Sequence, residues 1–223
     1  MSGKLIVFEG TDGSGKATQT KMLTEHLVRD GFPVKRISFP DYESESSALV
    51  RMYLSGSFGD KPGDVNAYAA SLFFAVDRFA SYRRTWGDIY ESGGLILADR
   101  YTTSNAVHQA SKLPEEERKA YLDWLYDLEY EKLGLPRPSA VFYLDIPTEI
   151  TEEMLRRREQ DTRTVADIHE KSEAYLRACR DNARFVAKLS GWTNIACVKD
   201  GRLRGQEDIH SEIYAYVREL VRQ

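Results

Sequence analysis

Five short apolar runs alternate along this chain with longer segments whose apolar residues recur at helical spacing. The runs cover residues 4–9, 33–39, 94–99, 140–145 and 194–199. Short apolar runs bounded by turn residues are typical of buried strands. Because strands and helices alternate, we expect an α/β fold, in which helices cover both faces of a five-stranded parallel sheet.

The segments between these runs carry the helical patterns. We expect helices over residues 16–29, 48–54, 65–91, 115–133, 148–158, 167–189 and 207–221. A chain of 223 residues suits one compact domain, so we expect 1–223 to fold as a unit. The charge-dense segment 156–167 fits neither pattern and is interpreted as a mobile lid.

The bulk composition argues against several classes of partner. The formal net charge is −4, whereas proteins that bind nucleic-acid polymers or anionic membranes usually display a basic surface. The first apolar run holds only four residues, and no later run reaches the length of a membrane span. Only two cysteines, Cys179 and Cys197, are present, which indicates neither a disulfide framework nor a metal knuckle. We therefore expect a cytoplasmic protein.

The loop after the first strand has the spacing of a phosphate-binding loop. It reads G-x4-G-K from Gly10 to Lys16 and opens a predicted helix. In that setting backbone N–H groups and the helix N-terminus converge on phosphates, and Lys16 reaches the transferred group. We expect this segment to bind ATP through Gly10, Thr11, Asp12, Gly13, Ser14, Gly15, Lys16, Ala17 and Thr18. The alternative is a glycine-rich turn with an exposed lysine.

Ala17 stands where such loops usually place a hydroxyl group that ligates Mg²⁺. Alanine has no lone pair to offer, and Thr18 lies about 100° further around the helix axis. Magnesium can be held by nucleotide phosphates, water and one or two carboxylates. We expect that carboxylate to come from Asp12, Asp99 or Glu170.

Two later segments carry side chains suited to a second ligand. Phe74 and Arg78 lie four residues apart on a predicted helix and hence on one face. The segment "LADRYTTSNAVHQ" lies just beyond the carboxyl end of a strand, where open parallel sheets bind ligands. Its polar candidates are Asp99, Arg100, Ser104, Asn105 and His108.

Taken in order, these motifs resemble the bacterial thymidylate kinase family over nearly the whole chain. The motifs are the glutamate before the loop, "GKATQ" within it, "FP", "LFFAVDR", "DRYTTSN" and the basic lid. The resemblance implies a P-loop nucleoside monophosphate kinase that uses ATP and Mg²⁺ to phosphorylate dTMP to dTDP. It also implies a homodimer, with the long helix 65–91 as a candidate contact.

The resemblance assigns roles to the residues expected to bind the substrate. Phe74 would stack on the base, Arg78 would donate to a ring carbonyl oxygen, and Asn105 would pair with the ring N3–H. Arg100 would bind the monophosphate, for which a guanidinium offers a matched fork. Asp12 would accept from the sugar 3′-hydroxyl or hold the metal. Tyr42 and Ser104 would line the same pocket.

His108 departs from the pattern of the family, which usually has Tyr or Phe at this position to exclude a ribose 2′-hydroxyl. Histidine is smaller and can itself form a hydrogen bond. The sequence thus leaves dUMP and UMP open as alternative substrates. Because of Ala17, it also leaves open a nucleotide-binding protein without turnover.

Phosphoryl transfer requires positive charge around the moving group, and the loop itself lacks an arginine. Within the family, loops without arginine go with arginine-bearing lids. We therefore expect Arg157 and Arg163 of the lid to act with Lys16 and Arg100 as catalytic groups. Arg202, after the fifth strand, is expected near the adenine.

Several of these residues also allow a purely structural interpretation. Phe74 could be core, Arg78 a charge on the helix surface, and His108 a structural histidine. Arg100 could pair with its neighbour Asp99. The run 156–158 could be a solvated helix end favoured by the helix dipole.

Overall fold

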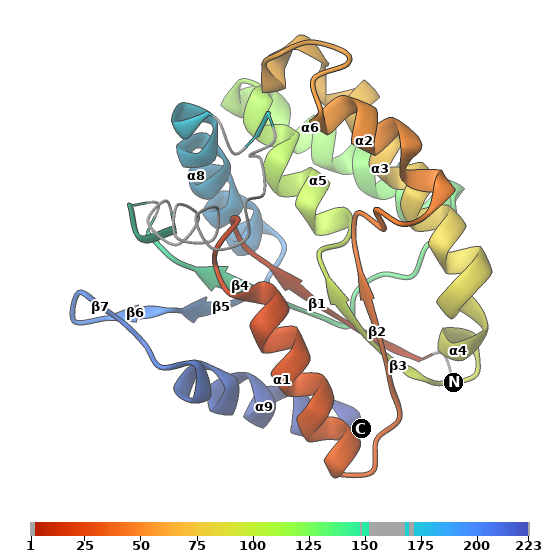
Figure 1. The fold of residues 1–223 in the computed structure, drawn as a ribbon, viewed down its shortest axis with the longest axis vertical. Helices are drawn as coiled ribbons and strands as arrows, with labels where there is room; N and C mark the ends of the chain where they lie inside the picture. The colour runs from red at the N-terminus through yellow and green to blue at the C-terminus, as the bar shows by residue number, and fades with distance from the viewer. Residues whose placement is uncertain (1–2, 148, 152–167, 170–171, 223) are drawn as a thin grey trace.

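The computed structural model describes residues 3–147, 149–151, 168–169 and 172–222. Its strands are β1 (Lys4–Glu9), β2 (Val34–Ser38), β3 (Leu95–Asp99), β4 (Ala140–Asp145), β5 (Thr193–Ala196), β6 (Val198–Lys199) and β7 (Arg202–Leu203). Within the described residues, the first five form one parallel sheet in the order β2-β3-β1-β4-β5, which confirms the predicted α/β fold (Figure 1). β6 and β7 form a separate antiparallel hairpin.

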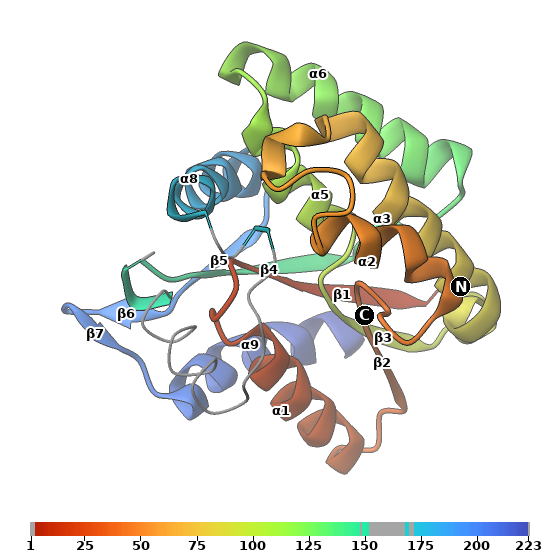
Figure 2. The same ribbon diagram turned by 45° about the horizontal axis from the view of Figure 1, so that its top comes forward.

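One face of the sheet is covered by α1 (Lys16–Arg29) and α9 (Gln206–Arg222), which lie side by side in Figures 1 and 2. Alternate residues of β1 point to this face, as the two-residue period of a strand requires. Ile6 and Phe8 pack there against Leu23 of α1 and Ile213 of α9 in one buried cluster. The first and last helices of the chain therefore share one core layer.

The opposite face is covered by helices from the middle of the chain. They are α3 (Ala67–Ser81), α4 (Gly87–Glu91), α5 (Thr102–His108), α6 (Glu115–Tyr126) and α8 (Glu173–Leu189), with the short α2 (Ala48–Leu54) beside α3. Leu5 and Val7 of β1 point to this side and pack with Trp86 and Tyr101. Of the described helices, none combines the length and apolar character needed to cross a bilayer.

Two predicted helices differ from the observed ones because each contains a π-helical segment. The helix expected over 65–91 begins only at Ala67, because the Asn66 side chain caps it by accepting from the backbone N–H of Ala69 at 2.8 Å. It is then interrupted by the π-helical segment Tyr82–Trp86. The helix expected over 115–133 ends in a second π-helical segment, Asp127–Lys132. Such insertions in α-helices are frequent at functional sites.

Other boundaries also moved. The helix expected from residue 167 begins at Glu173, where Ser172 caps it, and the last strand divides into β5 and β6. α5, directly after β3, is a helix that was not predicted from the sequence. Most of the helix expected over 148–158 and the whole lid segment 156–167 lie outside the described residues.

The central position of β1 fixes where a ligand can bind. β1 pairs with β3 on one side and with β4 on the other, all in parallel. The loops that follow β1 and β3 therefore leave the sheet at the same carboxyl edge, which is the ligand-binding edge of open α/β sheets.

Candidate active site

The loop between β1 and α1 has the backbone that a phosphate cradle requires. Gly13 and Gly15 have φ of 78° and 87°, in the left-handed region where glycine is favoured. A Cβ atom at Gly10 would lie 2.5 Å from Oγ of Ser14 and 3.0 Å from the carbonyl oxygen of Leu144. Gly15 immediately precedes α1, so the free N–H groups of the first helical turn open onto this loop.

Lys16 is held within the loop. Its Nζ donates to the carbonyl oxygen of Thr11 at 2.8 Å, and the residue is only 6% exposed. Burial lowers the pKa of Lys16, as does the charge of Arg100, while Asp12, Asp99 and Glu9 oppose that shift. The alternative of a turn with an exposed lysine is therefore wrong.

Glu9, the last residue of β1, is fully buried and gathers donors from two segments. Its Oε1 accepts from the backbone N–H of Gly10 at 2.9 Å. Its Oε2 accepts from the hydroxyl groups of Thr103 and Ser104 at 2.8 and 2.7 Å. This carboxylate thus ties the start of the loop to α5.

Arg100 joins the same two segments from the other side. Its NH2 donates to Oδ1 of Asp12 at 2.6 Å, and its NH1 lies 3.4 Å from Oε1 of Glu9. NH1 also donates to Oγ of Ser104 at 3.3 Å and lies 3.2 Å from Nε2 of His108. The pairing observed for Arg100 is therefore with the phosphate loop and Glu9, whereas a pair with Asp99 had been the structural alternative.

The charged groups at this junction shift one another's pKa values. Burial disfavours the charged form of Arg100, but Asp12 and Glu9 outweigh burial and raise its pKa. For Asp12, burial acts to raise the pKa, and the cations Arg100 and Lys16 outweigh it and hold the pKa well below its usual range. Arg100 itself has φ of 68°, a left-handed conformation that is uncommon for a residue with a side chain.

Arg78 is fully buried, which rules out the alternative of a surface charge. Its Nε and NH2 donate to Oε2 and Oε1 of Glu129 at 2.7 and 2.5 Å. Burial acts to lower the pKa of Arg78, and the charge and hydrogen bonds of Glu129 more than compensate, so the pKa is raised. Asn105 lies beside this pair, with its Nδ2 3.4 Å from Oε1 of Glu129.

Phe74 lies in the middle of α3, and Tyr42 lies in the segment that follows β2. Phe74 is partly buried and meets the ring of Tyr53 edge-on, with 6.1 Å between ring centroids. Tyr42 is 50% exposed. Asp77, adjacent to Arg78, accepts from the backbone N–H of Asp41 and from Oγ of Ser46 at 2.9 and 2.7 Å. Asp77 therefore fixes the segment that carries Tyr42 to α3.

His108 is buried beside Arg100 and stacks at 5.9 Å on a second buried histidine, His169. Nε2 of His169 lies 2.7 Å from the hydroxyl group of Tyr53. Burial, reinforced by neighbouring cations, lowers the pKa of His169 to about 3 and that of His108 well below its usual value. Both rings are therefore neutral at physiological pH and can each donate and accept.

The candidate metal ligands differ in their freedom to bind a cation. Asp12 is engaged by Arg100, and the Ala17 position is exposed. Oδ1 of Asp99 is buried and makes no hydrogen bond within the described part of the chain. No group of three or more acidic, histidine or cysteine side chains among the described residues could enclose a metal. One carboxylate next to nucleotide phosphates fits Mg²⁺, which keeps several waters in protein sites.

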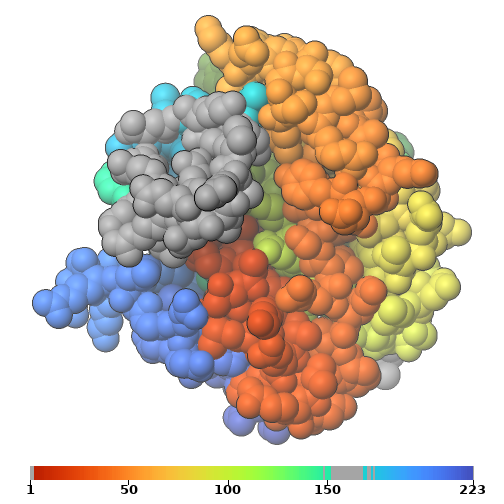
Figure 3. All heavy atoms as spheres, viewed as in Figure 1, coloured from red at the N-terminus to blue at the C-terminus, as the bar shows by residue number. Residues whose placement is uncertain are grey.

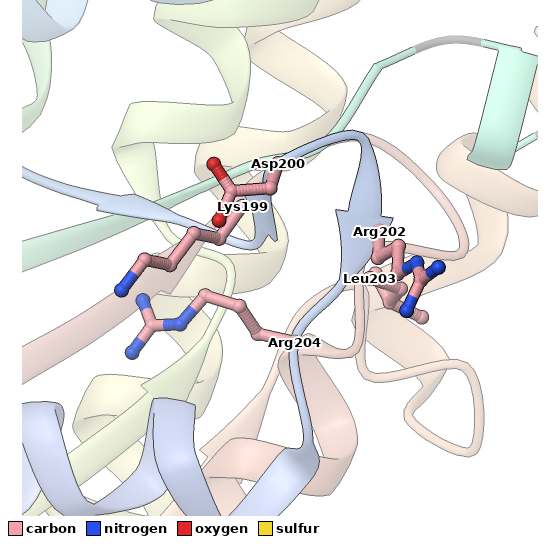
Figure 4. A pocket seen from close by; sticks show the side chains of 5 residues that line it. All are labelled: Lys199, Asp200, Arg202, Leu203 and Arg204. Atoms are coloured by element: carbon pink, nitrogen blue, oxygen red, sulfur yellow. The ribbon is translucent and has the colours of Figure 1, made fainter.

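The hairpin after β5 forms a shallow pocket lined by Lys199, Asp200, Arg202, Leu203 and Arg204 (Figure 4). Arg202 is exposed on β7, and its side chain points away from those of Lys199 and Arg204. The Arg204 side chain is held at 2.7 Å by both Asp208 and Glu212 of α9.

Figure 3 shows a hollow between the atoms of the phosphate loop and those that follow β2, with atoms from the region of β3 at its floor. The structure thus gathers the candidates from the loop and from the segment after β3. The lid arginines Arg157 and Arg163, together with the metal candidate Glu170, lie outside the described residues.

Some residues of this region were missed in the sequence. Glu129 lies in the charge-rich stretch "YDLEYEKL", which resembles an exposed helix face and gives no signal of burial. His169 adjoins the lid in the sequence and stood out from no pattern. Asp77 could have been found, since an acidic residue that directly follows the apolar run "LFFAV" calls for a buried partner.

Comparisons with known proteins identify the family of this chain. The family model for thymidylate kinase matches residues 8–213. The thymidylate kinase of Mycobacterium tuberculosis is 32% identical over 157 residues, covering 70% of this chain and 72% of that protein. A probable thymidylate kinase of Pyrococcus horikoshii is 30% identical over 218 residues, covering 98% and 97%. The solved thymidylate kinase of Candida albicans is 20% identical, with a TM-score of 0.73 over 98% of this chain and 92% of that one, and shares the fold. The chain therefore belongs to the thymidylate kinase family.

Proposed function

We propose that ATP and dTMP meet end to end over Lys16, with the acceptor phosphate bound by Arg100. The reaction is that of the family, the ATP-dependent phosphorylation of dTMP to dTDP. The observation that carries the proposal is the 2.6 Å contact between Arg100 and Asp12. It brings the residue expected to bind the acceptor against the loop expected to bind the donor.

In this proposal the donor lies along the loop and α1. The backbone N–H groups from Gly10 to Thr18 bind the phosphates of ATP, and Lys16 leaves the Thr11 carbonyl to contact the transferred group. The adenine lies near the pocket of Arg202. Lys16 and Arg100 flank the transferred phosphoryl group and offset the negative charge that separates two anionic nucleotides.

The acceptor lies between α3 and α5. Phe74 stacks on the thymine, Arg78 and Asn105 bind its polar edge, and Tyr42 and Ser104 line the phosphate end. Neutral His108 lies beside the sugar, where it can accept or donate a hydrogen bond. The 3′-hydroxyl group donates to Asp12.

Asp99 would hold Mg²⁺ together with the phosphates of ATP, because Oδ1 of Asp99 is the buried carboxylate oxygen without a hydrogen bond in the described region. Bound there, the ion would neutralise phosphate charge as transfer proceeds. Arg157 and Arg163, which lie outside the described residues, are proposed to complete the cationic environment of the transferred phosphoryl group.

We further propose that residues 1–223 form one domain in the cytoplasm. The first and last helices, α1 and α9, pack in the same core layer of one sheet, which supports a single unit. Cys179 and Cys197 are both buried free thiols, as is usual in a reducing compartment.

The substrate assignment is tested with a panel of acceptors. With ATP and Mg²⁺, kcat/KM is expected to be highest for dTMP and roughly 10⁴-fold lower for dCMP, because the wrong base leaves buried donors and acceptors unpaired. Coupled measurement of ADP release with dTMP, dUMP, UMP and dCMP gives the ranking. A preference for dCMP, or ATP binding without ADP release in the presence of dTMP, would contradict the proposal.

We also propose a homodimer formed through the outer face of α3. Four large apolar side chains at helical spacing are exposed there, with exposed fractions between 39% and 52%. They are Tyr68, Leu72, Val76 and Phe79. A continuous exposed apolar face of this kind marks an interaction site, and a two-fold axis lets one face pair with itself.

A charge in the middle of that face is expected to separate the subunits. Val76→Asp, at a position 52% exposed, should convert the dimer to a monomer, because the interface would bury an unpaired charge. The monomer should stay folded, because water can solvate the carboxylate on the exposed helix face. Val28→Asp on α1, at a position 54% exposed on the other side of the sheet, is the control and should remain dimeric. Sedimentation velocity measures both, and a dimeric Val76→Asp protein would exclude this face.

A further inference from the structure

We propose that Glu129 is a positioning residue that fixes the orientation of the Asn105 amide and thereby selects a base that carries a proton on N3. The inference rests on the proposed function, in which Asn105 binds the base. Glu129 itself lies behind the site, fully buried in the π-helical segment Asp127–Lys132 that follows α6.

Glu129 accepts hydrogen bonds from three side chains. Arg78 donates to both carboxylate oxygens at 2.7 and 2.5 Å. The hydroxyl group of Thr102 donates to Oε2 at 2.7 Å, and Nδ2 of Asn105 lies 3.4 Å from Oε1. A carboxylate offers about four acceptor positions, so these four contacts occupy it fully. Its orientation is therefore fixed by groups on α3 and α5.

The orientation of Asn105 follows from what surrounds its amide. Nδ2 faces the backbone carbonyl oxygen of Ser71 at 3.2 Å as well as Oε1 of Glu129. Both neighbours are acceptors, so the NH₂ group must point toward them, since the opposite orientation would set three oxygen atoms against one another. The Oδ1 atom is consequently on the branch that a ligand meets.

An amide oxygen presented to the base accepts a hydrogen bond and offers none. Thymine and uracil carry a proton on N3 and can donate to it, whereas N3 of cytosine is an acceptor and would face Oδ1 with no proton between them. The C4 carbonyl group of thymine also suits the donor Arg78, which the same carboxylate holds. Cytosine carries an amino group at that position. Glu129 therefore acts on base choice through two neighbours while it contacts no ligand itself.

The exchange Glu129→Gln tests this directly. Glutamine keeps the shape but replaces one acceptor oxygen with an NH₂ donor. Of the two acceptors that hold Nδ2 of Asn105, only the Ser71 carbonyl oxygen then remains, so the preference of Asn105 for presenting Oδ1 to the base is weakened. The ratio of kcat/KM for dTMP to that for dCMP should fall by at least about tenfold. Glu131→Gln, an exposed neighbour paired with Arg137, is the matched control and should leave the ratio unchanged. Glu129→Asp keeps a carboxylate and should retain most of the preference even where its rate falls.

A second variant covers the case in which Glu129→Gln does not fold because Arg78 loses its counter-charge. In Asn105→Asp, only a protonated carboxyl group can donate toward Glu129 while its carbonyl oxygen faces the base. Burial and the Glu129 carboxylate raise the pKa of the new group, and they outweigh the opposing charge of Arg78, whose guanidinium is already paired with Glu129. Its kcat/KM for dTMP should therefore decline, relative to the wild type, between about pH 6 and pH 9.

The outcomes distinguish a failure of the proposed function from a failure of the proposed role of Glu129. If the wild-type enzyme does not prefer dTMP to dCMP, the proposed function fails. If it does, and folded Glu129→Gln keeps the wild-type ratio, or Asn105→Asp follows the wild-type pH profile, the role of Glu129 is contradicted. A reduced ratio in Glu129→Gln with an unchanged ratio in Glu131→Gln supports it.

Discussion

Lys16→Ala is expected to lower kcat for dTDP formation by at least about 10²-fold, the loss typical of removing one group that stabilises charge in a transition state. Lys16 is the cation that the loop itself contributes, and its buried ammonium group already donates to the carbonyl oxygen of Thr11 in that loop. Its loss leaves the developing charge on the transferred phosphoryl group without the nearest donor. Single-turnover assays with saturating ATP and dTMP measure the effect on the chemical step.

The control for this variant lies five residues further along α1. The side chain of Lys21 is 67% exposed, so Lys21→Ala should behave as the wild type in the same assay. Circular dichroism checks that both variants keep their helices. Turnover of folded Lys16→Ala within a few-fold of the wild type would remove Lys16 from the site.

Arg100→Lys is expected to reduce kcat/KM for dTMP by about 10²-fold although it preserves the charge. The guanidinium of Arg100 reaches Asp12, Glu9 and Ser104 at once, and a single ammonium group cannot keep these contacts and also bind a phosphate in a bidentate manner. Lysine is preferred to alanine here, because leaving Glu9 buried without its cation could cost roughly 3–5 kcal/mol of stability.

Arg100→Lys is expected to weaken the binding of the acceptor, dTMP. The dissociation constant for ATP should change much less than that for dTMP, and isothermal calorimetry with each nucleotide alone distinguishes the two. Arg84→Lys, at an exposed position of the π-helical segment Tyr82–Trp86, serves as the control for the substitution itself. Equal losses of affinity for both nucleotides would contradict an acceptor-side role for Arg100.

The sheet and most of its helices could be predicted because their signals are local. The strand "KLIVFE" and the helix Lys16–Arg29 have the predicted bounds. A short apolar run and a helical pattern bounded by glycines can each be recognised from neighbouring residues alone. The π-helical segments could not be predicted, because each spans only five or six residues and no residue type marks such a segment. α5 is only seven residues long and carries mostly polar and small side chains, so no periodicity marked it.

In the candidate site, too, the residues with a local sequence signal could be predicted, and those that depend on tertiary contacts could not. The glycine and lysine spacing of the loop and the position of Arg100 after a strand pointed to residues that the fold brings together. The burial of Arg78 depends on Glu129, which is 51 residues away along the chain and joined to it only by the tertiary structure. The neutral state of His108 likewise depends on burial beside Arg100 and His169, which sequence spacing does not encode.

The central claim is that donor and acceptor share one cleft, with their phosphates meeting over Lys16. A crystal structure with a bisubstrate analogue, in which adenosine and thymidine are joined through a polyphosphate chain, tests it most directly. We predict that the polyphosphate lies along the loop from Gly10 to Thr18 and contacts Arg100, with the thymine against Phe74 and Asn105. Thymine bound outside the space between α3 and α5, or a polyphosphate out of reach of Lys16, would contradict the account.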